Sequence, residues 1–274
     1  MDQGRRRRSP PRSPALTVGR PGTLSSIASN TRLQGESMSS PVTYALNESV
    51  ATITLDDGKV NVLSPAMQQH VNDALDQAEQ AAAAGEVKAV VLAGNDRVLS
   101  AGFDLSVFNS GDAAAALGML SGGFELSIRL LTFPVPVVIA ATGPAIAMGS
   151  FMLLSGDHRV GSPSSRCQAN EVAIGMVLPI SAIEIMRMRL TRAAFQRAVA
   201  LAAVFSGDAA VSAGWLDEIV EDGNVLARAH EVAAEFAATL HVKAHRASKL
   251  KARDDGLKAI RAGIVGLPEE FGNS

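Results

Sequence analysis

The 274-residue sequence contains a single cysteine, Cys167, and very few aromatic residues. One cysteine can form neither an internal disulfide nor a cysteine-ligated zinc site, and such usage is typical of a reducing compartment. We therefore expect a cytoplasmic protein without a metal site. Aromatic residues make up only 4% of the chain and hydrophobic residues 47%, so the core must be mainly aliphatic.

Several common signatures are also absent. The longest apolar stretch, residues 132–154, is interrupted by prolines and glycines, so no charge-free segment is long enough to span a bilayer. The chain has no GxGxxG after a strand, no GxxxxGK[ST], no GxSxG and no HExxH. These absences argue against a membrane protein, a dinucleotide-binding protein, a P-loop NTPase, a serine hydrolase and a zinc protease.

Positive charge is concentrated at the N-terminus. Residues 1–37 contain seven arginines against two acids, a net charge of +5, so the rest of the chain carries −7. An acidic body argues against a nucleic-acid surface. We expect residues 1–40 to be a disordered basic extension: a transit peptide, a nucleic-acid arm, or sequence upstream of a true start at Met38.

The body of the chain begins with a strand–strand–helix–strand pattern. Alternating residues predict strands over 42–47 and 50–57, and Ser64 followed by Pro65 predicts a helix to about residue 84. Residues 88–94 form an apolar run typical of a buried strand. We further expect helices over 116–120, 122–132, 181–190, 193–205, 225–236 and 244–264, and a strand within 133–140.

Two small-residue turns stand out because each leads from a strand into a new segment. The first is Ser100-Ala101-Gly102, and the second is Ala147-Met148-Gly149, after which we expect a helix over 151–154. Turns of this kind leave backbone N–H groups available for an anion or a developing oxyanion. Glu171 lies beyond them as an isolated acid in an apolar stretch. It is either a solvated residue beside a helix cap or a base that removes a proton next to a carbonyl.

The chain from residue 41 onward, with both of these turns, resembles the crotonase superfamily, the enoyl-CoA hydratase/isomerase family. The motifs are LSAGFDL at 99–105, ATGPAIAMGSFMLLSGD at 141–157 and NEVAIGMVLP at 170–179, in the family's order and spacing. The resemblance implies an α/β fold: a ClpP-like spiral of ββα units over 41–195 and a C-terminal helical trimerisation region over 196–274. It also implies a coenzyme A thioester as the substrate, with no further cofactor.

The resemblance assigns the oxyanion donors to backbone N–H groups of Phe103 and Met148. Met148 replaces a usual glycine, so we expect its side chain to narrow the space beside the thioester. The substrate-binding positions implied are, in chain order, Val60, Val62, Ala101, Gly102, Asp104, Leu105, Glu125, Gly149 and Phe151. Lys249, Lys251 and Arg253 are candidates for the CoA phosphates.

The most informative departure concerns the two glutamates of the hydratases. The second matches Glu171, but the first falls on Phe151, which cannot move a proton. Adding water needs one group to activate the water and another to protonate carbon, whereas moving a double bond needs one base. A single glutamate therefore favours 3-enoyl-CoA to 2-trans-enoyl-CoA isomerisation in fatty-acid metabolism. Two alternatives remain: a hydratase that recruits another acid such as Glu125, and an acyl-CoA-binding protein without turnover.

Family members form trimers, often paired into hexamers. We expect the same of this chain, with an apolar stripe on the last helix facing a second subunit. The stripe consists of Ala247, Leu250, Leu257 and Ile260.

Overall fold

The computed structural model describes residues 40–272, so the predicted basic extension lies, apart from Ser40, outside the described residues. The chain begins with the hairpin of β1 (Val42–Asn47) and β2 (Val50–Leu55). Helix α1 (Pro65–Ala83) follows. Its first turn is fixed as the sequence predicts: the Ser64 hydroxyl accepts a hydrogen bond from the N–H of Met67 at 3.2 Å, and Pro65 occupies the first helical position.

A six-stranded sheet forms the centre of the fold. Its strand order is β1-β2-β3-β4-β6-β9, and every pair except β1–β2 is parallel. The four later strands are β3 (Ala89–Ala93), β4 (Val137–Ala140), β6 (His158–Gly161) and β9 (Glu218–Ile219). Strand β3 is buried along its whole length, as its unbroken apolar run indicates.

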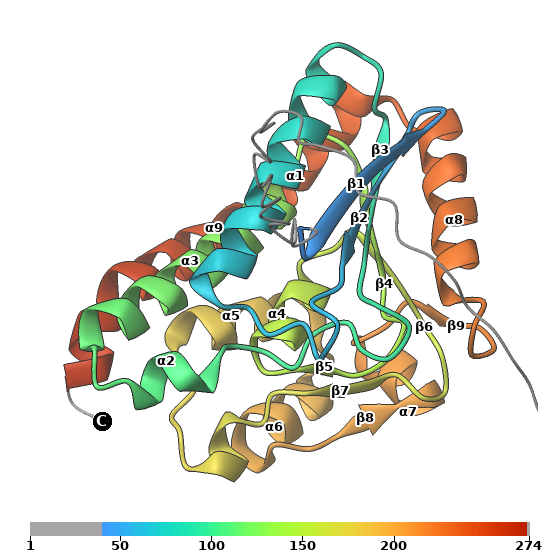
Figure 1. Ribbon diagram of the computed structural model, residues 1–274. Helices are drawn as coiled ribbons and strands as arrows, with labels where there is room; N and C mark the ends of the chain where they lie inside the picture. Colours follow the sequence, from blue (N-terminus) through green and yellow to red (C-terminus); the bar gives the residue numbers. More distant parts are fainter. Residues whose placement is uncertain (1–39, 273–274) are drawn as a thin grey trace, which may run out of the picture. The chain divides into compact units, whose positions relative to one another are not determined.

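Both faces of this sheet are covered by helices (Figure 1). Alternate residues of β3 point to opposite faces: Val90 and Leu92 join the main core, whereas Val91 joins a second core beneath helix α8 (Val225–Thr239). Burial on both sides explains why the strands need β-branched and aliphatic residues rather than an alternating pattern.

A smaller sheet completes the spiral. It has the order β5-β7-β8, with β5 (Ala145–Ile146), β7 (Arg166–Gln168) and β8 (Phe205–Ser206). Two isolated parallel bridges extend this sheet: Ser100 pairs with Ala145 of β5, and Val62 pairs with Gly102. The expected spiral of ββα units is therefore present, with the second strand of the early units reduced to a bridge.

The remaining helices surround these sheets. They are α2 (Leu105–Asn109), α3 (Ala113–Thr132), α4 (Met148–Leu154), the 3-10 helix η1 (Glu171–Ile174), α5 (Ile180–Arg189), α6 (Arg192–Leu201), α7 (Gly207–Ala213) and α9 (Val242–Gly272). Helix α6 ends at Leu201, short of the predicted residue 205, because Ala202 takes a left-handed conformation.

Helix α3 is one continuous helix, not the two shorter ones predicted from residues 116–120 and 122–132. Gly122 and Gly123 lie inside this helix, at positions where side chains from elsewhere in the fold pack too closely for a Cβ atom. A Cβ atom at Gly123 would lie 2.6 Å from the ring of Phe103, and one at Gly122 would lie 2.3 Å from the Gln68 side chain. Here glycine permits close packing rather than ending the helix.

By length and composition, α3 is also apolar enough to cross a membrane. It lies within the fold, where it packs on α1 and α9 and contributes Leu126 and Leu130 to the main core. A buried core helix satisfies the same criterion as a membrane span.

Helix α9 packs along α5 and α3 of its own chain. Leu257 and Ile260 are therefore buried within the chain, whereas Ala247 is exposed. This corrects the interpretation of the apolar stripe, because its most apolar members are already covered without a second subunit. The expectation of a trimer or hexamer remains a prediction.

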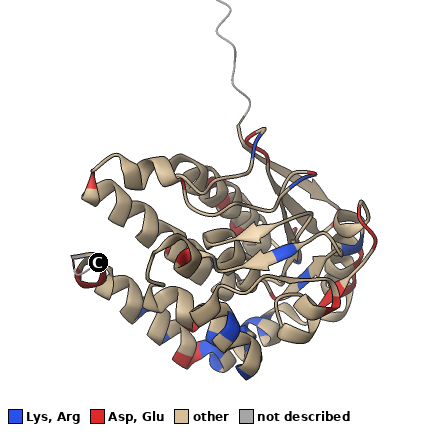
Figure 2. Ribbon diagram, turned by 90° about the horizontal axis from the view of Figure 1, so that it is seen from below, with Lys and Arg blue, Asp and Glu red and all other residues tan. Residues whose placement is uncertain are grey.

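Helix α9 is joined to the sheet by buried charges. Asp157 accepts hydrogen bonds from Lys249 Nζ and Arg253 Nη2, both at 2.9 Å, and from the N–H of Val137 at 2.8 Å. Lys249 is only 7% exposed. These two cations therefore hold the fold together and are unavailable to CoA phosphates, contrary to expectation. Figure 2 marks where the charged residues lie along the ribbon; another buried cation, Arg159, is 4% exposed and pairs with Asp217 at 2.8 Å.

Replacing Asp157 with asparagine should destabilise the fold. Burial raises the pKa of Asp157, but Lys249 and Arg253 more than offset this and hold it below its usual range. A carboxyl whose pKa is lowered by folding contributes stability above its unfolded pKa and loses it as pH falls through the folded pKa. We expect Asp157→Asn to lose about 3 kcal/mol or more at pH 7, measured by urea unfolding, since it leaves two buried cations uncompensated.

Asp254→Asn is the matched control, because Asp254 pairs with Lys258 on an exposed surface. It should change the free energy of unfolding by less than about 0.5 kcal/mol. Equal effects of the two substitutions would refute the structural role of Asp157.

Candidate active site

The two small-residue turns lie directly against each other. The N–H of Ile146 donates to the carbonyl of Ser100 at 3.0 Å. A Cβ atom at Gly102 would lie 2.8 Å from Ala147 Cβ, and one at Gly149 would lie 2.4 Å from the Ser100 carbonyl oxygen. Both glycines are therefore required for the close approach of the two backbones. Neither lines the adjoining cavity, which corrects their expected role as substrate contacts.

This packing leaves two backbone donors unused. Within residues 40–272, the N–H groups of Phe103 and Met148 donate to no protein acceptor. Met148 is the first residue of α4, so its N–H has no partner within the helix. The preceding residue, Ala147, holds φ 48° and ψ −126°, a conformation that favours glycine. The N–H of Ala147 itself donates to the carbonyl of Gln168 at 2.9 Å.

A cavity of about 1010 Å³ opens beside the turns. It brings together eight of the residues singled out in the sequence: Val60, Val62, Ala101, Phe103, Asp104, Leu105, Phe151 and Glu171. They come from the loop after β2, the first turn with α2, helix α4 and the start of η1. The predicted site residues thus converge on one cavity, although their chemical roles stay predictions.

Glu171 is the buried acid of this cavity. It is 7% exposed, and within the described residues its Oε2 atom has no hydrogen-bond partner. Burial raises the pKa of Glu171 to about 7, partly offset by a backbone hydrogen bond. A carboxyl with such a pKa can both accept and return a proton near neutral pH, which is what acid–base catalysis requires.

Glu171 should make the stability of the protein depend on pH. Its pKa is higher in the folded state, so its contribution is fully present below the unfolded value of 4.5 and is lost as pH rises through about 7. Glu171→Gln should therefore match the wild type near pH 4. Well above pH 7 it should be more stable by on the order of 3 kcal/mol. Urea unfolding at a series of pH values measures the difference in stability between the two proteins. A difference that does not change with pH would contradict the raised pKa of Glu171.

Phe151, to which the resemblance assigns the position of the missing glutamate, lies on the first turn of α4. It is 1% exposed, lines the cavity and stacks on Phe124 with ring centroids 6.3 Å apart. Two further carboxylates line the same cavity, but each is engaged elsewhere. Asp104 Oδ1 caps α2 by accepting from Ser106, and Glu270 Oε2 accepts from the N–H of Ile180 at 3.2 Å.

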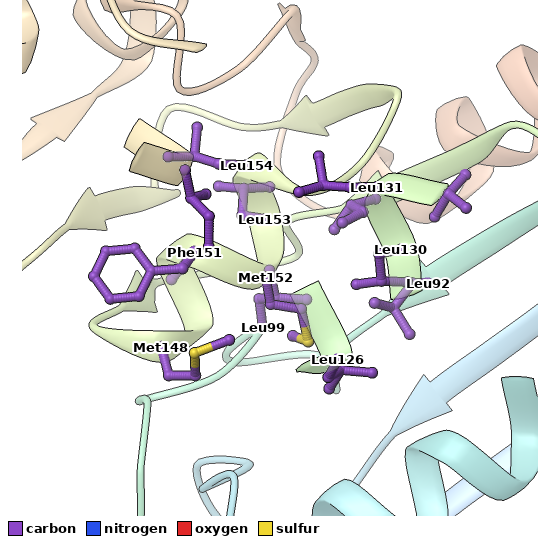
Figure 3. Close-up of a cluster of buried hydrophobic side chains, with 14 of the residues drawn as sticks. Leu92, Leu99, Leu126, Leu130, Leu131, Met148, Phe151, Met152, Leu153 and Leu154 are labelled. Atoms are coloured by element: carbon purple, nitrogen blue, oxygen red, sulfur yellow. The ribbon is translucent and has the colours of Figure 1, made fainter. Parts of the chain in front are cut away.

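The side chain of Met148 does not narrow this space, contrary to expectation. It is fully buried and absent from the cavity lining. Figure 3 shows it within a buried cluster that includes Met152 from the same helix and Leu126 from α3. A contact between Met148 and a ligand could therefore involve only its backbone.

Glu125 does not lie in the cavity either. It is exposed on α3 and is not among the lining residues, although its neighbour Phe124 is. The expectation that Glu125 borders the acyl pocket is therefore wrong, because the helix turns its side chain to solvent.

Sequence reasoning missed the aromatic part of the lining. Phe108 from α2, Phe124 from α3 and Phe271 from α9 all contribute to the cavity, as does Asn170 beside the acid. The scarcity of aromatic residues was the available signal. The chain has only nine phenylalanines, and several of them lie near the first turn in the sequence, which suggests a common site.

The turns thus leave two N–H groups without protein acceptors beside a cavity that holds a buried carboxylate. Comparison with known proteins identifies the family. The Enoyl-CoA hydratase/isomerase family matches residues 45–272, and the chain belongs to it. A putative enoyl-CoA hydratase from Thermus thermophilus is 31% identical over 192 residues, which cover 69% of this chain and 74% of the relative.

Solved structures agree with this assignment. The enoyl-CoA hydratase EchA3 from Mycobacterium ulcerans is 55% identical with a TM-score of 0.81, over 84% of this chain and 99% of that one. An apo structure named as the Mycobacterium tuberculosis enoyl-CoA isomerase is 52% identical with a TM-score of 0.81, over 85% and 100%. A structure of that same protein is also named a probable enoyl-CoA hydratase, at 53% identity, a TM-score of 0.82 and coverage of 85% and 96%. The fold is therefore the crotonase fold, and the protein is an enzyme of this family.

Proposed function

We propose that this enzyme is an isomerase that converts a 3-enoyl-CoA into the 2-trans-enoyl-CoA. One observation carries the proposal: Glu171 is a buried carboxylate of the cavity whose Oε2 atom has no partner within the described residues, and Phe151, to which the resemblance assigns the position of the second acid, lines the same cavity. The family's relatives carry both activity names, so the choice between them rests on this pair of residues.

The proposed reaction needs one base and one oxyanion site. Glu171 removes a proton from C2 of the thioester, and the electron pair moves onto the thioester oxygen. The N–H groups of Phe103 and Met148 hold that oxygen as the enolate forms. Protonated Glu171 then delivers the proton to C4, the enolate collapses, and the double bond has moved from C3–C4 to C2–C3.

Hydration is the second candidate, and it fits this cavity less well. Hydration needs one group to activate the water and a second group to protonate carbon, and Phe151 can do neither. Glu125 is exposed outside the cavity, one oxygen of Asp104 accepts from Ser106 at the start of α2, and one oxygen of Glu270 accepts from the N–H of Ile180 at the start of α5. An acyl-CoA-binding protein without turnover would have no need of a carboxyl whose pKa lies near 7.

The direct test supplies the purified enzyme with a 3-enoyl-CoA and, separately, with a 2-trans-enoyl-CoA. We expect rapid conversion of the first and negligible formation of 3-hydroxyacyl-CoA from the second. Hydration without isomerisation would favour the hydratase, and tight binding with neither reaction would favour the binding protein.

Glu171→Gln should lower isomerase kcat by at least about a thousandfold while changing the Kd for acyl-CoA little, because the amide keeps the shape but accepts no proton. Glu125→Gln is the matched control and should keep wild-type turnover, since Glu125 lies outside the cavity. Substantial turnover by Glu171→Gln, or loss of turnover in the control, would place the base elsewhere.

Phe151→Glu should create hydratase activity on the 2-enoyl-CoA if Phe151 occupies the first acid position. Two close carboxylates in an apolar site raise one pKa and cost stability, so the folded state must be checked by circular dichroism. Phe151→Gln is the control, because it adds a polar group of similar shape that cannot act as a base. Equal hydration by the two variants, or none in a folded Phe151→Glu, would show that the position is not the missing acid.

A further inference from the structure

Phenylalanine is concentrated in the candidate active site to a degree that the rest of the core does not share. Of the nine phenylalanines in the sequence, five line the cavity: Phe103, Phe108, Phe124, Phe151 and Phe271. Elsewhere the described core is mainly aliphatic, and its other buried aromatic residues are Phe133, Phe195, Phe205 and Trp215. Core packing alone therefore does not account for this distribution.

The five rings form one continuous row. Phe151 stacks on Phe124 at 6.3 Å and 28°, and Phe124 meets Phe103 edge to face at 6.2 Å and 77°. Phe103 meets Phe108 edge to face at 6.2 Å and 83°, and Phe108 stacks on Phe271 at 6.3 Å and 11°. These are the offset and T-shaped geometries that aromatic rings prefer. The row joins helices α4, α3, α2 and α9 across one wall of the cavity.

The backbone is shaped to hold this row. Gly123 faces the ring of Phe103 so closely that any side chain there would displace it, since a Cβ atom would lie 2.6 Å from the ring. Phe103 also supplies the N–H group assigned to the oxyanion. Phe103 is the middle ring, so the row passes beside the assigned thioester position, with Phe124 and Phe151 on one side of it and Phe108 and Phe271 on the other.

On the basis of the proposed function, we propose that the preferred substrate carries an aromatic ring on its acyl chain, beyond the reacting carbons. Such a ring can join the row with the same edge-to-face and stacked contacts that the phenylalanines make with one another. A saturated ring of the same size gains only apolar burial, which is at least as large for cyclohexyl as for phenyl. The two rings therefore separate aromatic recognition from general hydrophobicity.

The experiment compares 5-phenylpent-3-enoyl-CoA with 5-cyclohexylpent-3-enoyl-CoA. We expect kcat/KM to be about tenfold higher for the phenyl compound. In Phe124→Leu and Phe108→Leu the ratio should fall toward one, because each removes a ring from the row. In Phe133→Leu, a fully buried phenylalanine outside the cavity, the ratio should be unchanged. Equal or better use of the cyclohexyl compound by the wild type would overturn the proposal.

Binding of the saturated analogues keeps this test independent of turnover. If 5-phenylpentanoyl-CoA binds about tenfold more tightly than 5-cyclohexylpentanoyl-CoA but neither enoyl compound is isomerised, the aromatic preference stands and the isomerase assignment fails. If both enoyl compounds are isomerised equally, the isomerase assignment stands and the aromatic preference fails. Circular dichroism of the leucine variants verifies that a changed ratio does not come from unfolding.

Discussion

The contact between the two glycine-containing turns is the constraint on which the site depends. Gly102 lies against Ala147, and Gly149 against the Ser100 carbonyl, at separations that leave no room for a side chain. This contact brings together segments from two successive units of the spiral and turns the N–H groups of Phe103 and Met148 away from protein acceptors. Because the donors belong to the backbone, the side chains at these positions are free to pack elsewhere, as Met148 does in the core.

The second constraint is electrostatic. A carboxyl group in an apolar cavity is costly to ionise, and burial, partly offset by a backbone hydrogen bond, raises the pKa of Glu171 to about 7. Phe151, which is 1% exposed, lines the same cavity. Just beyond the C-terminal end of α4 the electrostatic effect is reversed. Asp157 stays ionised there because two cations, Lys249 and Arg253, pair with it. Environment, not residue type, thus separates the raised pKa of Glu171 from the lowered pKa of Asp157.

Much of this arrangement could be predicted from the sequence. Ser64 with Pro65 fixed the start of α1, and the motifs around Phe103, Met148 and Glu171 located the turns and the acid that meet at one cavity. The errors arose where tertiary contacts decide the outcome. Gly122 and Gly123 permit close packing inside α3, Glu125 faces solvent, and Lys249 and Arg253 pair with a distant aspartate. The direction of the Glu125 side chain and the pairing of Lys249 and Arg253 with a residue far away in the sequence depend on the tertiary fold. Neither could therefore be predicted from the local sequence.

The central claim is that one carboxylate both removes and returns the proton. It is tested most directly by the stereochemistry of isomerisation, using 3-enoyl-CoA stereospecifically deuterated at C2 and analysing the product at C2 and C4 by NMR and mass spectrometry. The account predicts that the proton leaves C2 and arrives at C4 on the same face of the substrate, with part of the deuterium transferred from one carbon to the other. Loss from one face and delivery from solvent to the opposite face would require a second acid and would contradict the account.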